Sequence, residues 1–452
     1  MSGSALRPMP VAAGHWLLGS AREMRDRTHS FPAELGLSHG GLARFRILHR
    51  GMIAVSHPDL IREVLVSRHE RYERSFHYKN SELAVGRGLI ATDGPYWKLR
   101  RRQVQPAFRP EHLRRIVPAV HAAAAAMAER WEQARRAGQA VPLVEEMQTL
   151  TLTVMCQALL SIRVSPAEAR EFGRLVRESL YLVRRKNTSL CPVPHWLPSP
   201  GNRALRRRRD RLDDFVGGHL QPRTRPGAEP RDDIAQALLD AHDPETGEAL
   251  PWQALIDETK TLFAAGFETT ATALTWTLHR LSQEPAIAAA WHDEVDRVLG
   301  GRAPTWDDLP KLEYTSRVFN ETMRLYPPVY NLGRVCREDD VLGGCRIRRG
   351  ETLLLSIYGA HRTPEFWPEP ERFDPDRFLP GREPAKHAFL PFALGKHLCV
   401  GATFAQAEAV LVLALIAQRY RLVPVTELAV PVTAQLTLVP AREIPVRLEP
   451  RA

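Results

Sequence analysis

The residues with the clearest potential for chemistry lie in the stretch 389–401, F-L-P-F-A-L-G-K-H-L-C-V-G, which holds one cysteine, Cys399. Gly395 and Gly401 lie close to this cysteine, and glycine lets a backbone turn tightly or approach a flat ligand. The apolar, alanine-rich segment 402–420 predicts a buried helix, whose N-terminal dipole favours the thiolate form of Cys399. The stretch therefore indicates a soft thiolate ligand for a metal. The alternative is a buried structural cysteine, which is the commoner fate of a lone Cys.

A second candidate is the pair Glu321 and Arg324, in N-E-T-M-R-L-Y-P-P. Three residues apart on a helix, they share a face and can form an ion pair. If the pair lies on the surface it contributes little to stability. Because Phe319, Met323 and Leu325 flank the pair, part of this helix is expected to be buried, where charges need partners.

A third candidate lies in the long apolar segment 251–283, which carries A-A-G-F-E-T-T at 264–270. Glu268 and Thr269 place an acid and a hydroxyl in an otherwise apolar helix, and Gly266 costs about 1 kcal/mol there relative to alanine. One interpretation is a core helix whose threonines bond back to backbone carbonyls. The functional interpretation is a kink that makes room for a small ligand, with Glu268 and Thr269 supplying protons to it.

Trp97 and Arg101 are four residues apart and share a helix face. One interpretation is that they cap the helix, with the aliphatic part of Arg101 lying along apolar surface. The other interpretation is that they bind a ligand together.

The elements that must position these residues are mostly helical. We expect a β-hairpin over 42–57 that turns at Arg50-Gly51, and an irregular aromatic loop over 70–93. Short strands are expected near 333–337, 345–348 and 352–356 and within 420–449, and the six prolines of 363–384 exclude regular structure there. The predicted helices are 58–66, 96–103, 110–136, 143–162, 166–186, 202–221, 232–242, 251–283, 285–299, 312–325 and 402–420.

The fold class is therefore mainly α with small β-sheets, in one domain over 1–452 whose first 40 or so residues are an extension without a membrane anchor. The five cysteines, odd in number and without metal-binding spacing, suit a reducing compartment, so we expect a soluble protein of the cytoplasm. The net charge of +10 raises the possibility of nucleic-acid binding. The densest basic run, 206–209, alternates with aspartates as on a solvated helix face, and no nucleic-acid motif accompanies it.

The stretch around Cys399 resembles the haem-binding loop of the cytochrome P-450 family, Phe-x-x-Gly-x-x-x-Cys-x-Gly. Phe392, Gly395, Cys399 and Gly401 match it. Ala393 stands where a glycine is frequent, and His397 stands where an arginine is frequent. The resemblance implies that Cys399 is the iron ligand and that His397 donates a hydrogen bond to a haem propionate.

The other candidates resemble further motifs of the same family, in the same order. Glu321 and Arg324 match Glu-x-x-Arg, and Arg377 of the proline-rich coil is expected to complete that cluster in preference to Arg372. The segment 265–270 matches the oxygen-activation motif, which gives Glu268 and Thr269 their proton-delivery role. By the same resemblance, Trp97, Arg101 and Arg334 contact haem propionates.

The resemblance implies a P-450 fold with a long central helix over haem b, and a monooxygenase that uses O2 and two electrons to hydroxylate an apolar, lipid-like or terpenoid molecule. The electrons would come from a separate ferredoxin or flavodoxin with its reductase, docked on a basic face that includes Lys98, Arg102 and Lys396. Two rivals stay open, a peroxide-using or peroxide-rearranging haem enzyme and a gas sensor or carrier without turnover. The expected substrate pocket includes Phe76, Phe263, Phe267, Val329, Tyr330 and Asn331, with Leu262, Leu332, Leu436 and Leu438.

Overall fold

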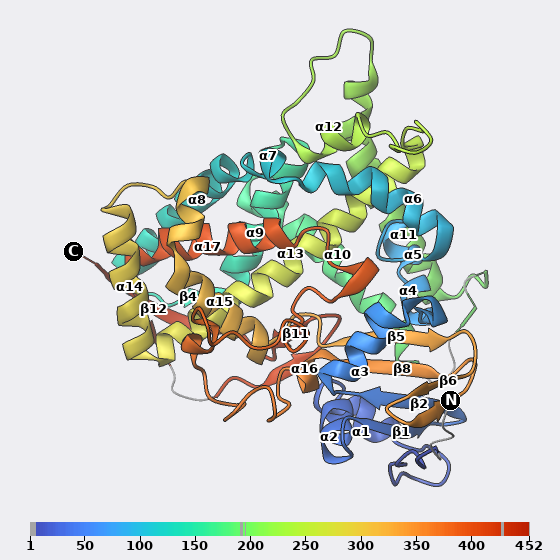
Figure 1. Cartoon of the computed structure of the whole chain (residues 1–452). Helices are drawn as coiled ribbons and strands as arrows, with labels where there is room; N and C mark the ends of the chain where they lie inside the picture. The colour runs from blue at the N-terminus through green and yellow to red at the C-terminus, as the bar shows by residue number, and fades with distance from the viewer. Residues whose placement is uncertain (1–5, 190–192, 195, 426–428, 452) are drawn as a thin grey trace.

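A computed structural model describes residues 6–189, 193–194, 196–425 and 429–451. Helices fill most of the molecule, and a five-stranded sheet lies at one side next to α1 (Ala21–Asp26) and α2 (Ser30–Ser38) (Figure 1). This confirms a mainly α fold with small sheets. Within the described ranges, no helix combines the length and the apolar character needed to cross a membrane.

The five-stranded sheet has the strand order β1-β2-β8-β5-β3, with β2 and β8 parallel and the other pairs antiparallel. The predicted hairpin is present, but the turn was placed two residues too late. Arg50 pairs with Ile47, so the chain turns at Leu48 and His49, with Leu48 at a φ of 54°. The strands are β1 (Leu42–Ile47), β2 (Arg50–Val55), β3 (Tyr72–Arg74), β5 (Asn331–Cys336) and β8 (Thr352–Ser356).

Three smaller sheets complete the β structure. One has the order β4-β12-β9, and the other two are the hairpins β6-β7 and β10-β11. Their bounds are β4 (Val141–Pro142), β6 (Asp340–Leu342), β7 (Cys345–Ile347), β9 (Tyr420–Pro424), β10 (Val432–Ala434), β11 (Leu438–Pro440) and β12 (Pro445–Pro450).

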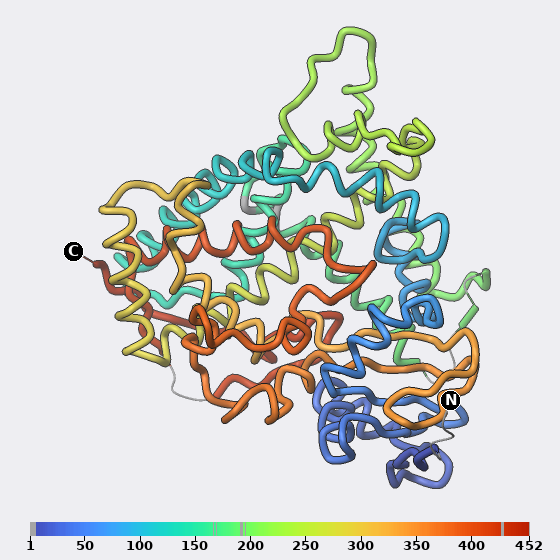
Figure 2. The backbone as a smooth tube through the Cα atoms, viewed as in Figure 1, coloured from blue at the N-terminus to red at the C-terminus, as the bar shows by residue number. Residues whose placement is uncertain are grey.

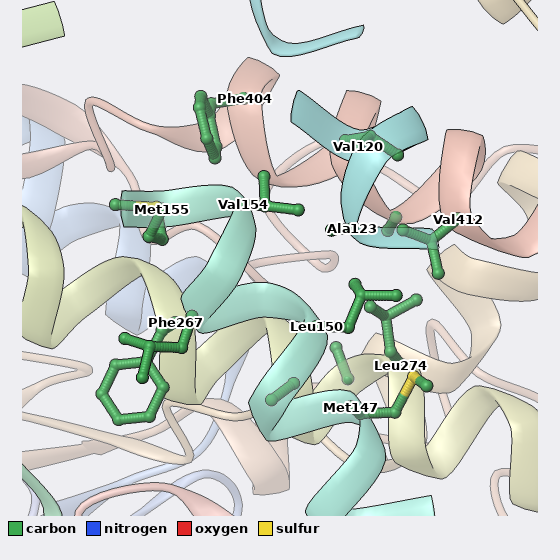
Figure 3. Close-up of a cluster of buried hydrophobic side chains, with 14 of the residues drawn as sticks. Val120, Ala123, Met147, Leu150, Val154, Met155, Phe267, Leu274, Phe404 and Val412 are labelled. Carbon is green, nitrogen blue, oxygen red and sulfur yellow. The ribbon is translucent and has the colours of Figure 1, made fainter. Parts of the chain in front are cut away.

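The helix α13 (Trp252–Gln283) is 32 residues long and mostly buried. At 1.5 Å per residue it extends about 48 Å. It contacts α9 (Leu143–Leu160), α11 (Pro200–Leu220), α15 (Glu313–Leu325) and α17 (Ala402–Ala417). Side chains of α9 and α13 mix with those of α8 (Ile116–Arg136) and α17 in the main core (Figure 3).

Gly266 has a packing role within α13. A Cβ on this residue would lie 2.8 Å from Met155 Sδ of α9, closer than real Cβ contacts come. The helix α13 is continuous across Gly266. The glycine is therefore explained by the close approach of α9 and α13.

The remaining helices surround this centre. The segment 70–93 is more ordered than expected, since it forms β3, α4 and α5, and the helix expected over 110–136 is divided at Arg114 and Arg115. The bounds are α3 (Pro58–Arg62), α4 (Phe76–Lys79), α5 (Glu82–Val85), α6 (Gly94–Val104), α7 (Pro110–Leu113), α10 (Pro166–Asn187), α12 (Ile234–Leu239), α14 (Pro285–Leu299) and α16 (Ile357–Ala360). A π turn (Glu63–Ser67) and 3₁₀ turns (His69–Arg71, Gln105–Phe108, Gln221–Thr224, Trp306–Lys311, Pro375–Phe378, Gly395–His397) connect them.

The helix α2 packs on the five-stranded sheet. Phe31 and Leu35 of this helix are buried against Phe45 and Met52 of the β1-β2 hairpin. The proline-rich segment 363–384 follows an irregular path, orange in Figure 2, and contains a single 3₁₀ turn at Pro375–Phe378.

Candidate active site

Cys399 lies at the end of a tightly folded loop that leads into α17. Its backbone N–H donates to Phe392 O at 3.0 Å, and Gly395 adopts a φ of 69°. A Cβ on Gly395 would lie 2.1 Å from Leu65 O, so only glycine fits there. Ala393 has a φ of 63°, a left-handed conformation that strains a residue with a Cβ. The frequent glycine of the family motif would relieve that strain.

The Cys399 side chain is accessible, unlike the other described free cysteines, Cys156, Cys336 and Cys345, which are buried. Cys191 lies outside the described residues. Burial by surrounding protein raises the pKa of the Cys399 thiol, opposed by the Gly401 backbone hydrogen bond and by Arg101. Burial thus opposes the thiolate form that the position before α17 favours. A coordinated metal would favour the thiolate, because a thiol that binds a metal loses its proton.

One large cavity, of about 1710 Å³, brings the separate motifs together. All seven residues expected to bind the cofactor line it: Trp97, Arg101, Arg334, Phe392, His397, Cys399 and Gly401. The α13 residues on its wall include Leu262, Ala265, Gly266 and Thr269. This i, i+3, i+4, i+7 spacing gives one continuous helix face.

Seven described arginines line the cavity, and three of them, Arg74, Arg101 and Arg334, are considered as propionate partners. Arg334 is 3% exposed and donates to the adjacent Gly333 O at 2.9 Å, and in the described chain no carboxylate pairs with it. Arg101 donates to Leu398 O at 2.9 Å. Buried guanidinium groups require counter-charges, and a haem with two propionates would supply them.

The third arginine, Arg74, was not anticipated. It donates to Ile90 O at 3.0 Å and Thr92 O at 2.9 Å, and lies 5.9 Å from the centre of the Trp97 ring. Burial lowers its pKa to about 10. Arg74 lies within the aromatic segment 72–78, which the sequence had suggested as a functional loop. No motif, however, singled out this arginine within the loop.

His397 has a different partner from the expected propionate. Its Nε2 lies 3.1 Å from Asp93 Oδ1, and its ring centre lies 4.4 Å from that of Trp97. Burial lowers the pKa of His397 to about 4, against the effect of Asp93, so the ring is neutral at pH 7. The pairing with Asp93 uses Nε2. The expected contact of His397 with a propionate stays a prediction.

The Glu321, Arg324 and Arg377 side chains meet as expected. Arg324 binds Glu321 through two bonds of 2.7 and 2.8 Å, and both side chains are fully buried. Arg377 Nε lies 3.4 Å from Glu321 Oε1, whereas the Arg372 side chain pairs with Glu369 at the surface. Arg324 and Arg377 also donate to carbonyls of the proline-rich segment, at His361, Pro368, Glu369, Pro370 and Arg372.

His361 joins this cluster to the cysteine loop, and the sequence did not reveal it. Its Nδ1 lies 3.1 Å from Arg324 O, and its Nε2 accepts from Leu390 N at 2.7 Å. The second bond requires an unprotonated Nε2, and burial accordingly lowers the pKa of His361 to about 3. No spacing rule marks a lone histidine of this kind, so only the tertiary structure identifies it.

Glu268 and Thr269 both line the cavity. Thr269 Oγ donates to Ala265 O at 2.6 Å, the back-bonding that the core interpretation predicted. Glu268 is 5% exposed, and its Oε1 accepts from Thr437 Oγ at 2.8 Å. Burial raises its pKa, opposed by this bond and by Arg177.

Of the expected pocket residues, Phe76, Val329, Tyr330 and Asn331 line the cavity, as do Leu262, Leu332 and Leu436. Phe263, Phe267 and Leu438 do not. Phe263 packs on Phe172 of α10 at 5.4 Å between ring centres, and Phe267 lies in the main core (Figure 3). The reason is helical geometry, because these two phenylalanines share a different face of α13 from Leu262 and Thr269.

An accessible cysteine in a glycine-relieved loop, a basic wall and an apolar helix around one large cavity define a haem-thiolate protein. The family model for cytochrome P450 matches residues 9–446, and the chain belongs to the cytochrome P450 family. It is therefore a monooxygenase of the oxidoreductase class, with haem b and its iron as cofactor.

Curated relatives are similar over nearly the whole chain. Cyclooctatin synthase of Streptomyces melanosporofaciens is 36% identical over 446 residues, which cover 97% of this chain and 94% of that protein. Cyclooctat-9-en-7-ol 5-monooxygenase of the same organism is 34% identical and covers 90% and 88%. Pentalenene oxygenase of Streptomyces avermitilis is 32% identical and covers 100% and 98%.

Among solved structures, the cytochrome P450DA heme domain superposes with a TM-score of 0.91 at 28% identity. The match covers 99% of this chain and 98% of that one. The expected P-450 fold is thereby confirmed.

Proposed function

We propose that this protein hydroxylates an apolar, terpenoid-like molecule with dioxygen and two electrons. The observation that carries the proposal is the 1710 Å³ cavity, where Cys399, the basic wall and the apolar face of α13 meet. Burial of apolar surface binds apolar ligands, at about 0.8 kcal/mol for each methylene. The names of the relatives refer to cyclooctatin, a cyclooctatenol and pentalenene, and they support a substrate of this class.

In this proposal Cys399 Sγ would hold the haem iron, and Arg74, Arg101 and Arg334 would neutralise the propionates. When bound, the haem supplies the redox-active iron at which dioxygen is activated. Trp97 packs beside His397, and the His397–Asp93 pair closes this side of the cavity. Glu268 and Thr269 hold and transfer protons on the α13 side.

The expected polar anchors of the substrate are partly occupied. Tyr330 donates its hydroxyl to Gln435 O at 2.7 Å, and Asn331 Nδ2 donates to Thr28 O at 3.3 Å. Asn331 Oδ1 is buried without a protein partner in the described chain. Asn331 is therefore the better candidate to bind a hydroxyl group on an otherwise apolar substrate.

The experiment is a spectral binding screen of the haem-loaded protein with cyclic diterpenes, their mono-alcohols, fatty acids and small charged compounds. We expect the terpenoids to shift the haem spectrum and to be hydroxylated when a reductase system and O2 are supplied. A screen in which only small charged compounds bind would contradict the substrate class. Equal turnover with peroxide alone would contradict the use of dioxygen and two electrons.

We also propose that a separate ferredoxin or flavodoxin supplies the electrons. Lys98 and Lys396 are exposed and support a basic docking surface near the cysteine loop. Arg102 does not fit this role as expected, since it pairs with Asp243 at 2.5 Å and with Glu245 at 2.9 Å. A single haem domain that works in the cytoplasm is part of the proposal, supported by one core cluster from Ala84 to Leu448 and by the free thiols.

A further inference from the structure

The Glu268 side chain has one hydrogen-bond partner, and that partner lies on a distant part of the chain. Thr437 Oγ donates to Glu268 Oε1 at 2.8 Å, and both side chains are buried. Glu268 Oε2 is buried without a protein partner in the described ranges. The position of the carboxyl group therefore depends on where Thr437 is held.

Thr437 belongs to the three-residue turn 435–437 between β10 and β11, and this turn lines the cavity. The turn is fixed internally by Gln435 N, which donates to Thr437 O at 2.8 Å. It is fixed to the segment after α15 by Tyr330 Oη, which donates to Gln435 O at 2.7 Å. Further support comes from Leu438 N, which donates to Pro328 O at 3.0 Å.

The same turn is attached to α13 itself. Trp276 Nε1 donates to Leu438 O at 2.9 Å, and its ring stacks on Tyr326 at 4.3 Å between centres. Glu268 and Trp276 are eight residues apart on α13, about two helical turns, and they contact the adjacent residues Thr437 and Leu438. Four hydrogen bonds thus hold the Thr437 hydroxyl in a fixed place beside Glu268.

The charged surroundings of Glu268 leave it dependent on this contact. Arg177 of α10 is the cation that acts on it, but the Arg177 guanidinium donates to Gln148 Oε1 at 2.7 Å. Among the described residues that line the cavity, Glu268 is the one acid. Burial raises the pKa of Glu268, and the Thr437 hydroxyl and Arg177 oppose that rise. The carboxyl group is therefore oriented by the single hydroxyl of Thr437.

We propose that Thr437 is a positioning residue that anchors Glu268 to the β10–β11 turn, and that this anchor, rather than α13 alone, fixes where the acid stands for proton delivery. The inference rests on the proposed function, in which Glu268 transfers protons. It also links the substrate-facing turn to the proton pathway, since residues 435–437 line the cavity that receives the substrate.

The test uses the haem-loaded full chain with Thr437→Val, which removes the hydroxyl at nearly constant shape, and Thr437→Ser, which keeps it. Thr433→Val on β10 is the matched control, because Thr433 is half-buried and does not line the cavity. The Glu268 carboxyl band is identified by infrared spectroscopy as the band that Glu268→Gln removes. Its titration midpoint is then measured in each variant.

Loss of a hydrogen bond to the carboxylate is expected to raise the midpoint in Thr437→Val by about one pH unit, a tenfold change in the ionisation equilibrium. Thr437→Ser and Thr433→Val are expected to keep the parent midpoint. An unchanged titration midpoint of Glu268 in Thr437→Val, or an equal shift in Thr433→Val, would contradict the proposal that Thr437 positions Glu268.

The second readout is the fraction of electrons recovered as hydroxylated product. We expect Thr437→Val to lower it two- to fivefold, an estimate for partial loss of general acid catalysis, and Thr437→Ser to restore it. If Glu268→Gln lowers this fraction while Thr437→Val matches the parent in both readouts, the anchor alone is wrong. If Glu268→Gln leaves the fraction unchanged, the proton role in the proposed function is wrong, and the infrared result still decides the anchor.

Discussion

At the scale of single residues, the chemistry depends on side chains whose neighbours set their protonation. Surrounding protein raises the pKa of the Cys399 thiol, and burial raises the pKa of the Glu268 carboxyl. His397 is neutral and bound to Asp93, whose own pKa is raised by burial but lowered overall by hydrogen bonds from His397 and two backbone N–H groups. The site thus combines groups whose charged forms burial disfavours, Cys399, Glu268 and His397, with the ionised Asp93.

Cys399→Ser is expected to abolish the thiolate-type spectrum of the reduced carbon monoxide complex, because a serine hydroxyl does not supply a soft thiolate ligand. Absorbance spectra of the reduced, carbon monoxide-bound protein test this. Cys336→Ser is the control, since Cys336 Sγ donates to Glu338 O at 2.8 Å, a bond that serine can retain. Retention of the thiolate spectrum in Cys399→Ser would show that the ligand is another residue.

Thr269→Ala is expected to keep haem and substrate binding but to divert electrons to peroxide, because proton delivery next to the apolar face of α13 is lost. We expect the ratio of product to NAD(P)H consumed to fall by about tenfold, which is less than the roughly 10²-fold minimum for complete loss of a general acid–base group. Thr277→Ala is the matched control, since Thr277 makes the same back-bond, to Ala273 O at 2.8 Å, and does not line the cavity. An equal ratio of product to NAD(P)H consumed in the Thr269 and Thr277 variants would contradict the proposed role of Thr269 in proton delivery.

At the scale of elements, the cysteine loop is positioned from two directions. Leu65 O leaves room only for a glycine at 395, and His361 ties Leu390 N to the helix that carries Glu321 and Arg324. The buried ion cluster in turn holds the proline-rich segment by its carbonyls. This explains why a long segment without regular structure has a fixed path.

His361→Asn is expected to lower the free energy of unfolding at pH 7 by about 1–3 kcal/mol, because one buried hydrogen-bond partner is lost. The folded pKa of His361, about 3, lies below the unfolded value of about 6.5. The contribution of His361 to the free energy of unfolding is therefore complete above pH 6.5. It declines as the pH falls toward 3, by up to about 1.4 kcal/mol per pH unit.

The difference in the free energy of unfolding between the parent protein and His361→Asn should accordingly shrink as the pH is lowered from 6.5 to 4.5. The reason is that asparagine, unlike histidine, does not become protonated on unfolding in this range. Urea unfolding at several pH values measures it. His279→Asn serves as a comparison, because His279 is buried on α13 and its pKa is lowered to about 4 by burial, yet it makes no contact with the cysteine loop. A difference that grows as the pH falls would contradict the neutral, loop-bound state of His361.

At the scale of the whole molecule, the positive charge has two separate uses. Arg74, Arg101 and Arg334 line the cavity where we propose that the haem binds, and Lys98 and Lys396 are exposed. The net charge of +10 favours encounter with an acidic partner, and salt weakens such steering.

Lys396→Glu is expected to slow reduction of the iron by an acidic ferredoxin about threefold to tenfold at low salt, and the difference should narrow by 0.5 M NaCl. Stopped-flow reduction kinetics at several ionic strengths test this. Arg442→Glu changes the charge by the same amount at another exposed site and is expected to have a smaller effect. A rate indifferent both to salt and to Lys396→Glu would exclude this docking surface.

The sequence by itself determined the helical class, the order of the elements, and the loop, helix and cluster motifs, because each of these depends on local spacing. Gly395 and Cys399 are close in the chain, and Glu321 and Arg324 share one helical turn. Periodicity also found α13, but it did not say which of its faces meets the cavity, so Phe263 and Phe267 were assigned to the wrong side. The Leu48–His49 turn was missed by two residues because alternation alone does not fix register.

Only the tertiary structure decided the contacts between distant segments. Arg74 on the cavity wall, the bond of His397 to Asp93, the two bonds of His361 and the bond of Thr437 to Glu268 join residues that are from about twenty to several hundred positions apart or lack any motif. The physical reason is that burial sets both the pKa and the hydrogen-bond partner of such groups, and burial is a property of the packed molecule rather than of any one stretch of chain.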